Sequence, residues 1–196
     1  IPAGPIKMAD LFNLYKYENQ LLVLQLSGQE IKRYLEESYS LWTNQMQSPA
    51  DHILLFRPDF EKALEPWQRL QHSSYNFDSA AGLNYTVDVR KPKGEKVTIL
   101  SMADGTAFDL QKQYRVAVNS YRANGGGGLL TKGAGIPLEK LKSRVLCTSD
   151  REMREYLRRD IARQSEINPH SINNWKFIPE DWVQQAATRD ANILFQ

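Results

Sequence analysis

The sequence predicts an α+β fold, with a mixed, largely antiparallel, curled sheet and two long amphipathic helices. Apolar residues recur at steps of three and four in the two segments near 29–44 and 148–166, whereas from Asn84 onward they alternate with a period of two. The chain of 196 residues is 41% hydrophobic and 24% charged, which is typical of a globular domain and not of a disordered chain.

The first part of the chain predicts a short helix, a strand and a long helix. Residues 8–15 have apolar side chains at helical spacing and predict two turns of helix. The run Leu21–Leu26 is dense in apolar residues and predicts a strand. Ser27 and Glu30 then have the spacing of a capping box, in which each side chain bonds the backbone amide of the other. A helix is therefore predicted from Gln29 to about Asn44.

Residues 46–75 mix prolines with aromatic residues and show no clear period. A connection of about thirty residues is longer than most loops of a compact domain, so we interpret it as an irregular insertion. The insertion is expected to belong to a single domain over residues 1–180. Residues 181–196 show no clear periodicity and are expected to form a flexible tail.

Alternating residues predict three further strands, over residues 83–89, 96–102 and 113–118. The connections between them contain turn-forming residues, among them Asp104 followed by glycine, with Asp109 further along. An Asp-Gly pair between strands is typical of a hairpin, so these carboxylates are interpreted as structural and not catalytic. The three strands are expected to curl into an antiparallel arrangement.

Residues 144–149 predict a last strand, in which Cys147 is expected to be buried as a small hydrophobic residue. Ser149 and Glu152 have the spacing of a second capping box and predict the start of the second long helix. Residues 167–182 are rich in turn formers, and the two tryptophans in this stretch are expected to pack back onto the body of the domain.

Composition excludes several classes of function. The 25 basic and 23 acidic residues are interleaved, so no basic stripe indicates nucleic-acid binding. No run approaches the ~20 apolar residues that a membrane-spanning helix needs. His52, His72 and His170 lie far apart in the sequence and Cys147 is the only cysteine, so neither a metal site nor a nucleophilic triad is predicted.

Four consecutive glycines close the stretch Asn119–Gly128, four residues after Tyr121. This is no phosphate-binding P-loop, because the required Gly-Lys-Ser/Thr ending is missing, and the dinucleotide-binding glycine pattern fails as well. Glycines do permit close approach of another group to the backbone. Tyr121 is therefore either a ring that stacks on a planar ligand or a core tyrosine beside a mobile loop, and both interpretations stay open here.

Several motifs occur together in one order. They are an aromatic-x-Asn sequence before the first strand, the Ser-Gly-x-Glu helix start, a Gly-x-x-Tyr strand, the Asp-Gly hairpin and the Asn-x-Tyr-x-x-x-Gly-Gly ending. In this combination the chain resembles the C-terminal domain of the bacterial 5′-nucleotidase and 2′,3′-cyclic-nucleotide phosphodiesterase/3′-nucleotidase family. The resemblance covers roughly residues 1–130 and, more loosely, residues 166–179.

The resemblance implies a nucleotide-recognition role, in which two aromatic rings clamp the nucleobase and an asparagine bonds its edge. The implied substrate-binding residues are Tyr17, Asn19, Tyr121, Gly125, Gly126 and Gly127. Many relatives have an acidic residue at the position of Gly127, and the resemblance implies that its side chain contacts the ribose. This chain has no side chain there and departs from the family pattern. A binding or interaction module that keeps the fold without nucleotide specificity is the alternative that this departure favours.

The resemblance further implies a metallophosphatase domain upstream of residue 1, with two divalent metal ions. The expected partners are that catalytic domain and a nucleotide or nucleoside, and the expected location is periplasmic, secreted or cell-surface. No catalytic residue, metal ligand or cofactor is expected in this chain, which alone is expected to be inactive.

Overall fold

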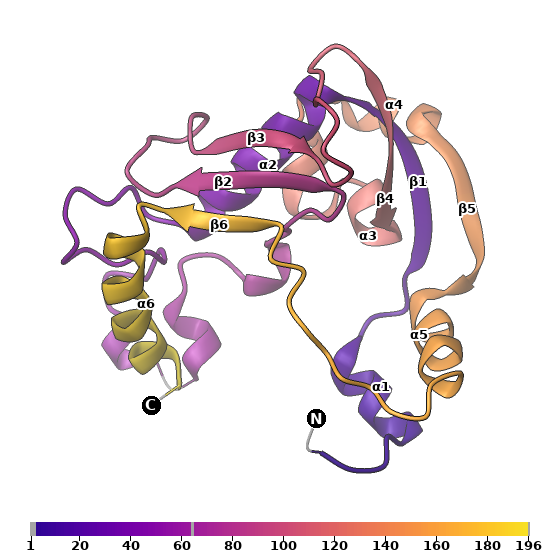
Figure 1. The fold of residues 1–196 in the computed structure, drawn as a ribbon, viewed down its shortest axis with the longest axis horizontal. Helices are drawn as coiled ribbons and strands as arrows, with labels where there is room; N and C mark the ends of the chain where they lie inside the picture. Colours follow the sequence, from indigo (N-terminus) through magenta and orange to yellow (C-terminus); the bar gives the residue numbers. More distant parts are fainter. Residues whose placement is uncertain (1–2, 64, 196) are drawn as a thin grey trace.

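The strands form two separate three-stranded sheets in this computed structural model, which describes residues 3–63 and 65–195 (Figure 1). The first sheet has the order β4-β1-β5 and consists of Gln113–Asn119, Gln20–Ser27 and Val145–Glu152. The second has the order β3-β2-β6 and consists of Val97–Met102, Leu83–Asp88 and Trp175–Ile178. All pairs are antiparallel except β2 with β6, so the predicted α+β class with largely antiparallel strands is confirmed.

The helices differ widely in length. The α-helices are α1 (Met8–Leu14), α2 (Gly28–Trp42), α3 (Ser120–Ala123), α4 (Leu138–Leu141), α5 (Met153–Ala162) and α6 (Glu180–Phe195). The described residues of the segment 46–76 form short 3-10 turns at Phe60–Lys62, Pro66–Arg69 and Ser74–Asn76. After α3, the chain continues through a 3-10 turn (Gly126–Gly128) and a π-helical turn (Leu129–Gly133), and another 3-10 turn, Lys142–Arg144, precedes β5.

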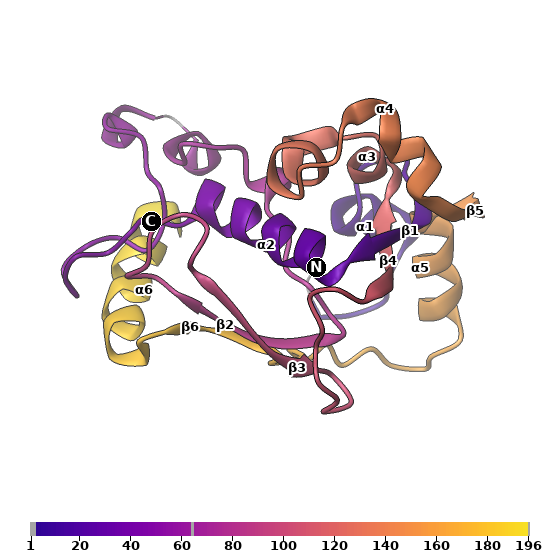
Figure 2. The same ribbon diagram turned by 90° about the horizontal axis from the view of Figure 1, so that it is seen from above.

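Helix α2 follows β1 directly, and Figure 2 shows it running along one face of the β3-β2-β6 sheet. The main core contains buried apolar side chains from β1, α2 and β2, such as Leu24, Leu35 and Val87. The predicted capping box is present: the amide of Ser27 donates to Glu30 Oε2 (2.7 Å), and the amide of Glu30 donates to Ser27 Oγ (3.2 Å). This cap satisfies two amides that have no partner within the helix.

Strand β4 does not stay with the β2–β3 hairpin, although the sequence suggested one curled arrangement of these strands. It pairs with β1 in a register that runs from Leu21 opposite Asn119 to Ser27 opposite Gln113. Strand β1 has buried leucines on one face and is the central strand, so β4 and β5 satisfy its backbone hydrogen-bonding groups on both edges. Alternation alone identifies a strand but not its partner.

Two expectations for the segment around β5 are wrong. Cys147 is exposed, and it lies in the edge strand β5 with exposed residues on both sides of it. The second capping box does not form, because β5 continues to Glu152 and α5 begins at Met153. Ser149 Oγ instead accepts from the amide of Leu21 (3.0 Å) and donates to the carbonyl of Arg151 (2.6 Å).

The C-terminal part is more regular than expected. Residues 175–178, in the stretch expected to be turn-rich, form β6, and residues 180–195, which include most of the expected flexible tail, form α6; Gln196 lies outside the described residues. Trp175 packs on Tyr39 with ring centroids 5.3 Å apart, and Trp182 packs on a second, smaller core. The prediction that both tryptophans return to the body is therefore confirmed.

Candidate functional site

Tyr17 and Tyr121 lie beyond the same end of the β1–β4 pair. Tyr17 precedes β1 by three residues and Tyr121 follows β4 by two, and the register places Leu21 opposite Asn119 at this end. Both rings are substantially exposed, at 51% for Tyr17 and 40% for Tyr121. Tyr121 is therefore not a core tyrosine, which was the alternative interpretation from the sequence.

Asn19 connects the segments that carry these tyrosines. Its side chain is buried, and its Oδ1 accepts from Ser120 Oγ (2.8 Å) and from the amide of Tyr121 (3.2 Å). Its Nδ2 donates to the hydroxyl of Tyr15 (3.2 Å). The side-chain oxygen of Asn19 is thus bound to the turn that carries Tyr121, whereas the resemblance implied a bond to the edge of a base.

The glycine run allows the ring of Tyr121 to lie close to the backbone of Gly126. A Cβ added at Gly126 would lie 2.4 to 2.6 Å from three carbons of this ring, so only a glycine lets the ring lie so close to the backbone. Gly127 has φ +74°, and a Cβ there would lie 2.3 Å from Arg122 Nη1 and 2.7 Å from Asn76 Oδ1. The space that a side chain at this position would need is therefore filled by Arg122 and Asn76.

Arg122 is the central residue of this region, and it was not predicted from the sequence. Its side chain is 3% exposed, and it forms a two-pronged ion pair with Asp78, with Nε to Oδ2 at 2.7 Å and Nη2 to Oδ1 at 2.8 Å. Its guanidinium carbon also lies 5.2 Å from the centre of the Tyr121 ring. Such pairing offsets the cost of burying the charge, and the planar fork fixes the geometry.

Asp78 also accepts from Tyr34, whose hydroxyl donates to the same Oδ2 that accepts from Arg122 Nε. Burial and the adjacent carboxylate raise the pKa of Tyr34 well above its ordinary value. The hydroxyl therefore stays protonated and remains a donor over the physiological pH range. Tyr34 lies on α2, so this network ties the site to the central helix.

A further ring, Tyr75, comes from the end of the insertion. It contacts Tyr17 with ring centroids 6.4 Å apart and planes inclined by 63°. The neighbouring Asn76 accepts from the hydroxyl of Tyr121 at its Oδ1 (3.0 Å). These two residues were missed because the insertion has no periodic pattern to indicate which of its side chains return to the sheet.

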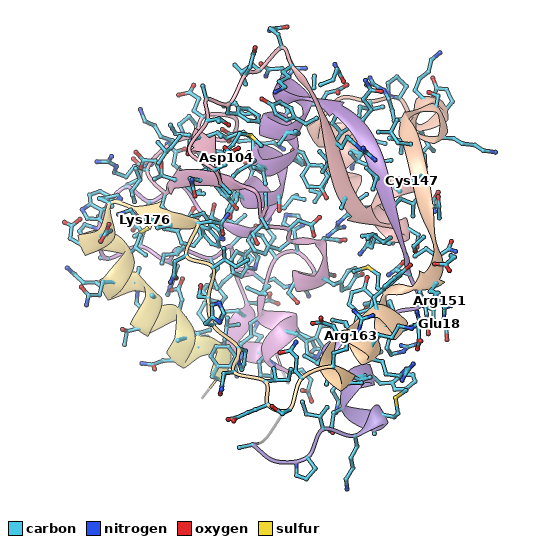
Figure 3. The ribbon with its side chains drawn as sticks, turned by 45° about the vertical axis from the view of Figure 1, so that its right-hand side comes forward. Glu18, Asp104, Cys147, Arg151, Arg163 and Lys176 are labelled. Carbon is cyan, nitrogen blue, oxygen red and sulfur yellow. The ribbon has the colours of Figure 1, made fainter. Side chains whose placement is uncertain are left out.

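Arg154 of α5 holds the segment that contains Tyr17. It is buried, and its Nη1 donates to the carbonyls of Tyr15 (3.2 Å) and Lys16 (3.3 Å). Its guanidinium carbon lies 4.0 Å from the centre of the Phe12 ring, which brings α1 and α5 together. Figure 3 shows Glu18 at this end of the molecule, well away from Asp104 in the β3–β4 connection.

A cavity of about 570 Å³ lies between the two sheets and is lined mainly by apolar side chains. Its volume is typical of small-molecule pockets, but neither Tyr17 nor Tyr121 lines it. It shares Asn119, Arg122 and Asp78 with the framework behind the tyrosines. The two exposed rings therefore lie on the surface, outside the lining of this cavity.

Within residues 3–63 and 65–195, no group of three or more His, Cys, Asp or Glu side chains is arranged to hold a metal ion. His52, which the sequence analysis assigned to no metal site, pairs with Asp190 (Nδ1 to Oδ1, 2.6 Å). None of the helices in these ranges combines the length and apolar character that crossing a membrane requires.

The family model described as "5'-nucleotidase, C-terminal domain" matches residues 1–132, and the chain belongs to this family. It is 30% identical over 195 residues to the 2',3'-cyclic-nucleotide 2'-phosphodiesterase/3'-nucleotidase of Salmonella typhimurium, covering 91% of this chain and 27% of that protein. It is 28% identical over 192 residues to the trifunctional nucleotide phosphoesterase protein YfkN of Bacillus subtilis, covering 91% of this chain and 12% of that protein.

Solved structures agree with this assignment. A putative 5'-nucleotidase from Staphylococcus aureus, in complex with alpha-ketoglutarate, superposes with a TM-score of 0.63 at 28% identity, over 88% of this chain and 30% of that chain. A 5'-nucleotidase precursor from Thermus thermophilus shares the fold, with a TM-score of 0.61 at 22% identity, over 91% of this chain and 29% of that chain. The chain thus spans less than a third of the length of these relatives.

Proposed function

We propose that this chain is the nucleotide-recognition domain of a nucleotide phosphohydrolase, in which Tyr17 and Tyr121 stack on opposite faces of the base. The main support is that both rings are exposed at the same end of the β1–β4 pair. Asn19, which bonds the amide of Tyr121, fixes one segment relative to the other. Membership of the 5'-nucleotidase C-terminal family makes a nucleotide the expected ligand.

Two ordered aromatic rings provide binding affinity but little selectivity among bases. Base–aromatic stacking contributes about 1–3 kcal/mol per base, and every base has a π-face. Side chains that are already ordered lose less entropy on binding. In this proposal Asn19 positions Tyr121, and the backbone of Gly125, Gly126 and Gly127 forms the adjoining wall.

The parent protein is proposed to be a metal-dependent phosphoric ester hydrolase outside the cytoplasm, either periplasmic, secreted or on the cell surface. Two divalent metal ions would be held by its catalytic domain, which is the proposed protein partner of this chain. The relatives are named a 3'-nucleotidase and a trifunctional nucleotide phosphoesterase, and these names support a nucleotide as the substrate class.

The alternative, an interaction module without nucleotide specificity, was favoured by the missing acidic side chain at Gly127. The structure gives a local reason for this glycine, because Arg122 and Asn76 occupy the space of a side chain. A glycine is required there whether or not a nucleotide binds. Gly127 therefore no longer favours the module over the nucleotide site.

The test is calorimetric titration of the chain with adenosine and with adenosine 5'-monophosphate. Each of Tyr17→Ala and Tyr121→Ala removes one stacking face, so each should weaken binding by about tenfold or more. Trp67→Ala is the matched control, because Trp67 is an exposed aromatic residue of the insertion and should leave the affinity unchanged. Unchanged affinity in both tyrosine variants would contradict the proposal.

A further inference from the structure

We propose that Tyr75 is a third aromatic wall of the site formed by Tyr17 and Tyr121, and that it contacts the edge of the bound nucleobase. This inference rests on the proposed function. If Tyr75 contacts the base, the insertion contributes to selectivity among nucleobases. Stacking on the other two rings alone provides little such selectivity.

The turn Ser74–Asn76 reaches both stacking rings with consecutive residues. The ring of Tyr75 contacts that of Tyr17 with centroids 6.4 Å apart, and Oδ1 of Asn76 accepts from the hydroxyl of Tyr121 (3.0 Å). The segments that contain Tyr17 and Tyr121 are far apart in the sequence, and both contact this short turn. Any ligand between Tyr17 and Tyr121 lies next to this turn.

A buried guanidinium fixes the position of the turn. Nη2 of Arg122 donates to the carbonyl of Tyr75 (2.9 Å), and Nη1 donates to Asn76 Oδ1 (3.2 Å). Arg122 is itself held by its ion pair with Asp78. The backbone of the turn is therefore ordered before any ligand binds, which reduces the entropy lost on binding.

The side chain of Tyr75, in contrast, is 57% exposed. Within the described ranges, its hydroxyl forms no hydrogen bond with another residue. A large aromatic side chain that is exposed on a fixed turn, with a polar group free at its tip, is typical of a binding residue and not of a core residue.

The orientation of Tyr75 indicates which part of a base it would meet. Its plane is inclined by 63° to that of Tyr17, so a base that lies parallel to Tyr17 cannot also lie face to face with Tyr75, and we assign Tyr75 to the edge of the base. Base edges differ in their donors and acceptors, and a tyrosine hydroxyl can both donate and accept. Tyr75 can therefore distinguish bases that stack equally well on the other two rings.

The experiment compares the affinities of adenosine, guanosine, cytidine and uridine for the wild-type chain and for Tyr75→Ala and Tyr75→Phe. Tyr75→Ala should lower the affinity for the most tightly bound nucleoside by about tenfold and reduce the differences among the four affinities. Tyr75→Phe keeps the ring but removes the hydroxyl, so it should narrow the differences with a loss of only about threefold. The thermal midpoint should change little in either variant, because the side chain is exposed.

Tyr75→Ala that binds all four nucleosides as tightly as the wild type, or more tightly, would overturn this inference. The proposed function would survive that result if Tyr17→Ala and Tyr121→Ala still weaken binding. If these two variants bind like the wild type, or if the wild-type chain binds none of the nucleosides, the proposed function fails and this inference fails with it. Trp67→Ala serves again as the control.

Discussion

The position of the Tyr121 ring can be tested by adding a single methyl group at Gly126. Gly126→Ala puts a Cβ within 2.4 to 2.6 Å of the ring, which must move away. Adenosine binding should weaken by about tenfold, because a displaced ring loses its stacking contact. Calorimetric titration measures this, with Asn124→Ala as the control, an exposed residue in the same turn.

The same substitution should have no further effect once Tyr121 is already alanine, since neighbouring substitutions that act through one contact are not additive. Additive losses in Gly126→Ala/Tyr121→Ala would show that Gly126 acts on binding by another route, against the packing described here.

At the residue scale, the sequence revealed what lies on regular elements and missed what depends on long-range contacts. Tyr17 and Tyr121 were proposed as candidates because motifs next to predicted strands contain them. Arg122 follows Tyr121 directly, but its partner Asp78 is 44 residues away and no pattern connects the two. Tyr75 was missed for the same reason.

Helix α6 is the element that departs most from expectation, and one buried carboxylate anchors it. Asp190 accepts from the amides of Ile53 (2.8 Å) and Leu54 (2.9 Å) and pairs with His52. Asp190→Ala leaves two buried amides without a partner, so we expect a loss of about 3 kcal/mol in the free energy of unfolding. Urea denaturation measures the loss.

Gln185→Ala is the matched control for this prediction, because Gln185 is exposed on the same helix. If Asp190→Ala is as stable as Gln185→Ala, the carboxylate does not anchor α6 to the insertion.

Elements with strong local signals were predicted well. Helix α2 has both an apolar face and a capping box, and β1 has a dense apolar run, so each was located within one or two residues. Strand β6 and α6 lack comparable signals, and their structure depends on packing against β2 and the insertion. The exposure of Cys147 was also unpredictable, because the sequence does not tell which strand becomes the edge of a sheet.

The stability of the whole molecule should rise with pH in the alkaline range. Burial lowers the pKa of Lys96 to about 8, although Glu36 and Asp88 oppose this shift. Between about pH 8 and 10.5 the unfolded chain keeps the proton that the folded chain has released, so the free energy of unfolding increases by roughly 3 kcal/mol. The Lys96 side chain is held in this buried position because its Nζ donates to the carbonyl of Asn44 (2.7 Å).

The rise should end near pH 10. Burial raises the pKa of Tyr39 and of Tyr34, so above their unfolded value near 10 these hydroxyls ionise first in the unfolded chain, and stability falls. Urea denaturation from pH 7 to 11 measures the profile. Lys96→Met should remove the rise, and Lys93→Met, at an exposed neighbour, should keep it. A profile that is flat from pH 8 to 10 in the wild type would contradict the buried, proton-releasing Lys96.

The placement of a base between Tyr17 and Tyr121 is tested most directly by NMR of the chain with adenosine. We predict nuclear Overhauser contacts from the base protons to the ring protons of both tyrosines, with upfield shifts of the base protons because both of its faces lie against aromatic rings. Contacts to the residues of the cavity between the sheets, with none to either tyrosine, would contradict this placement.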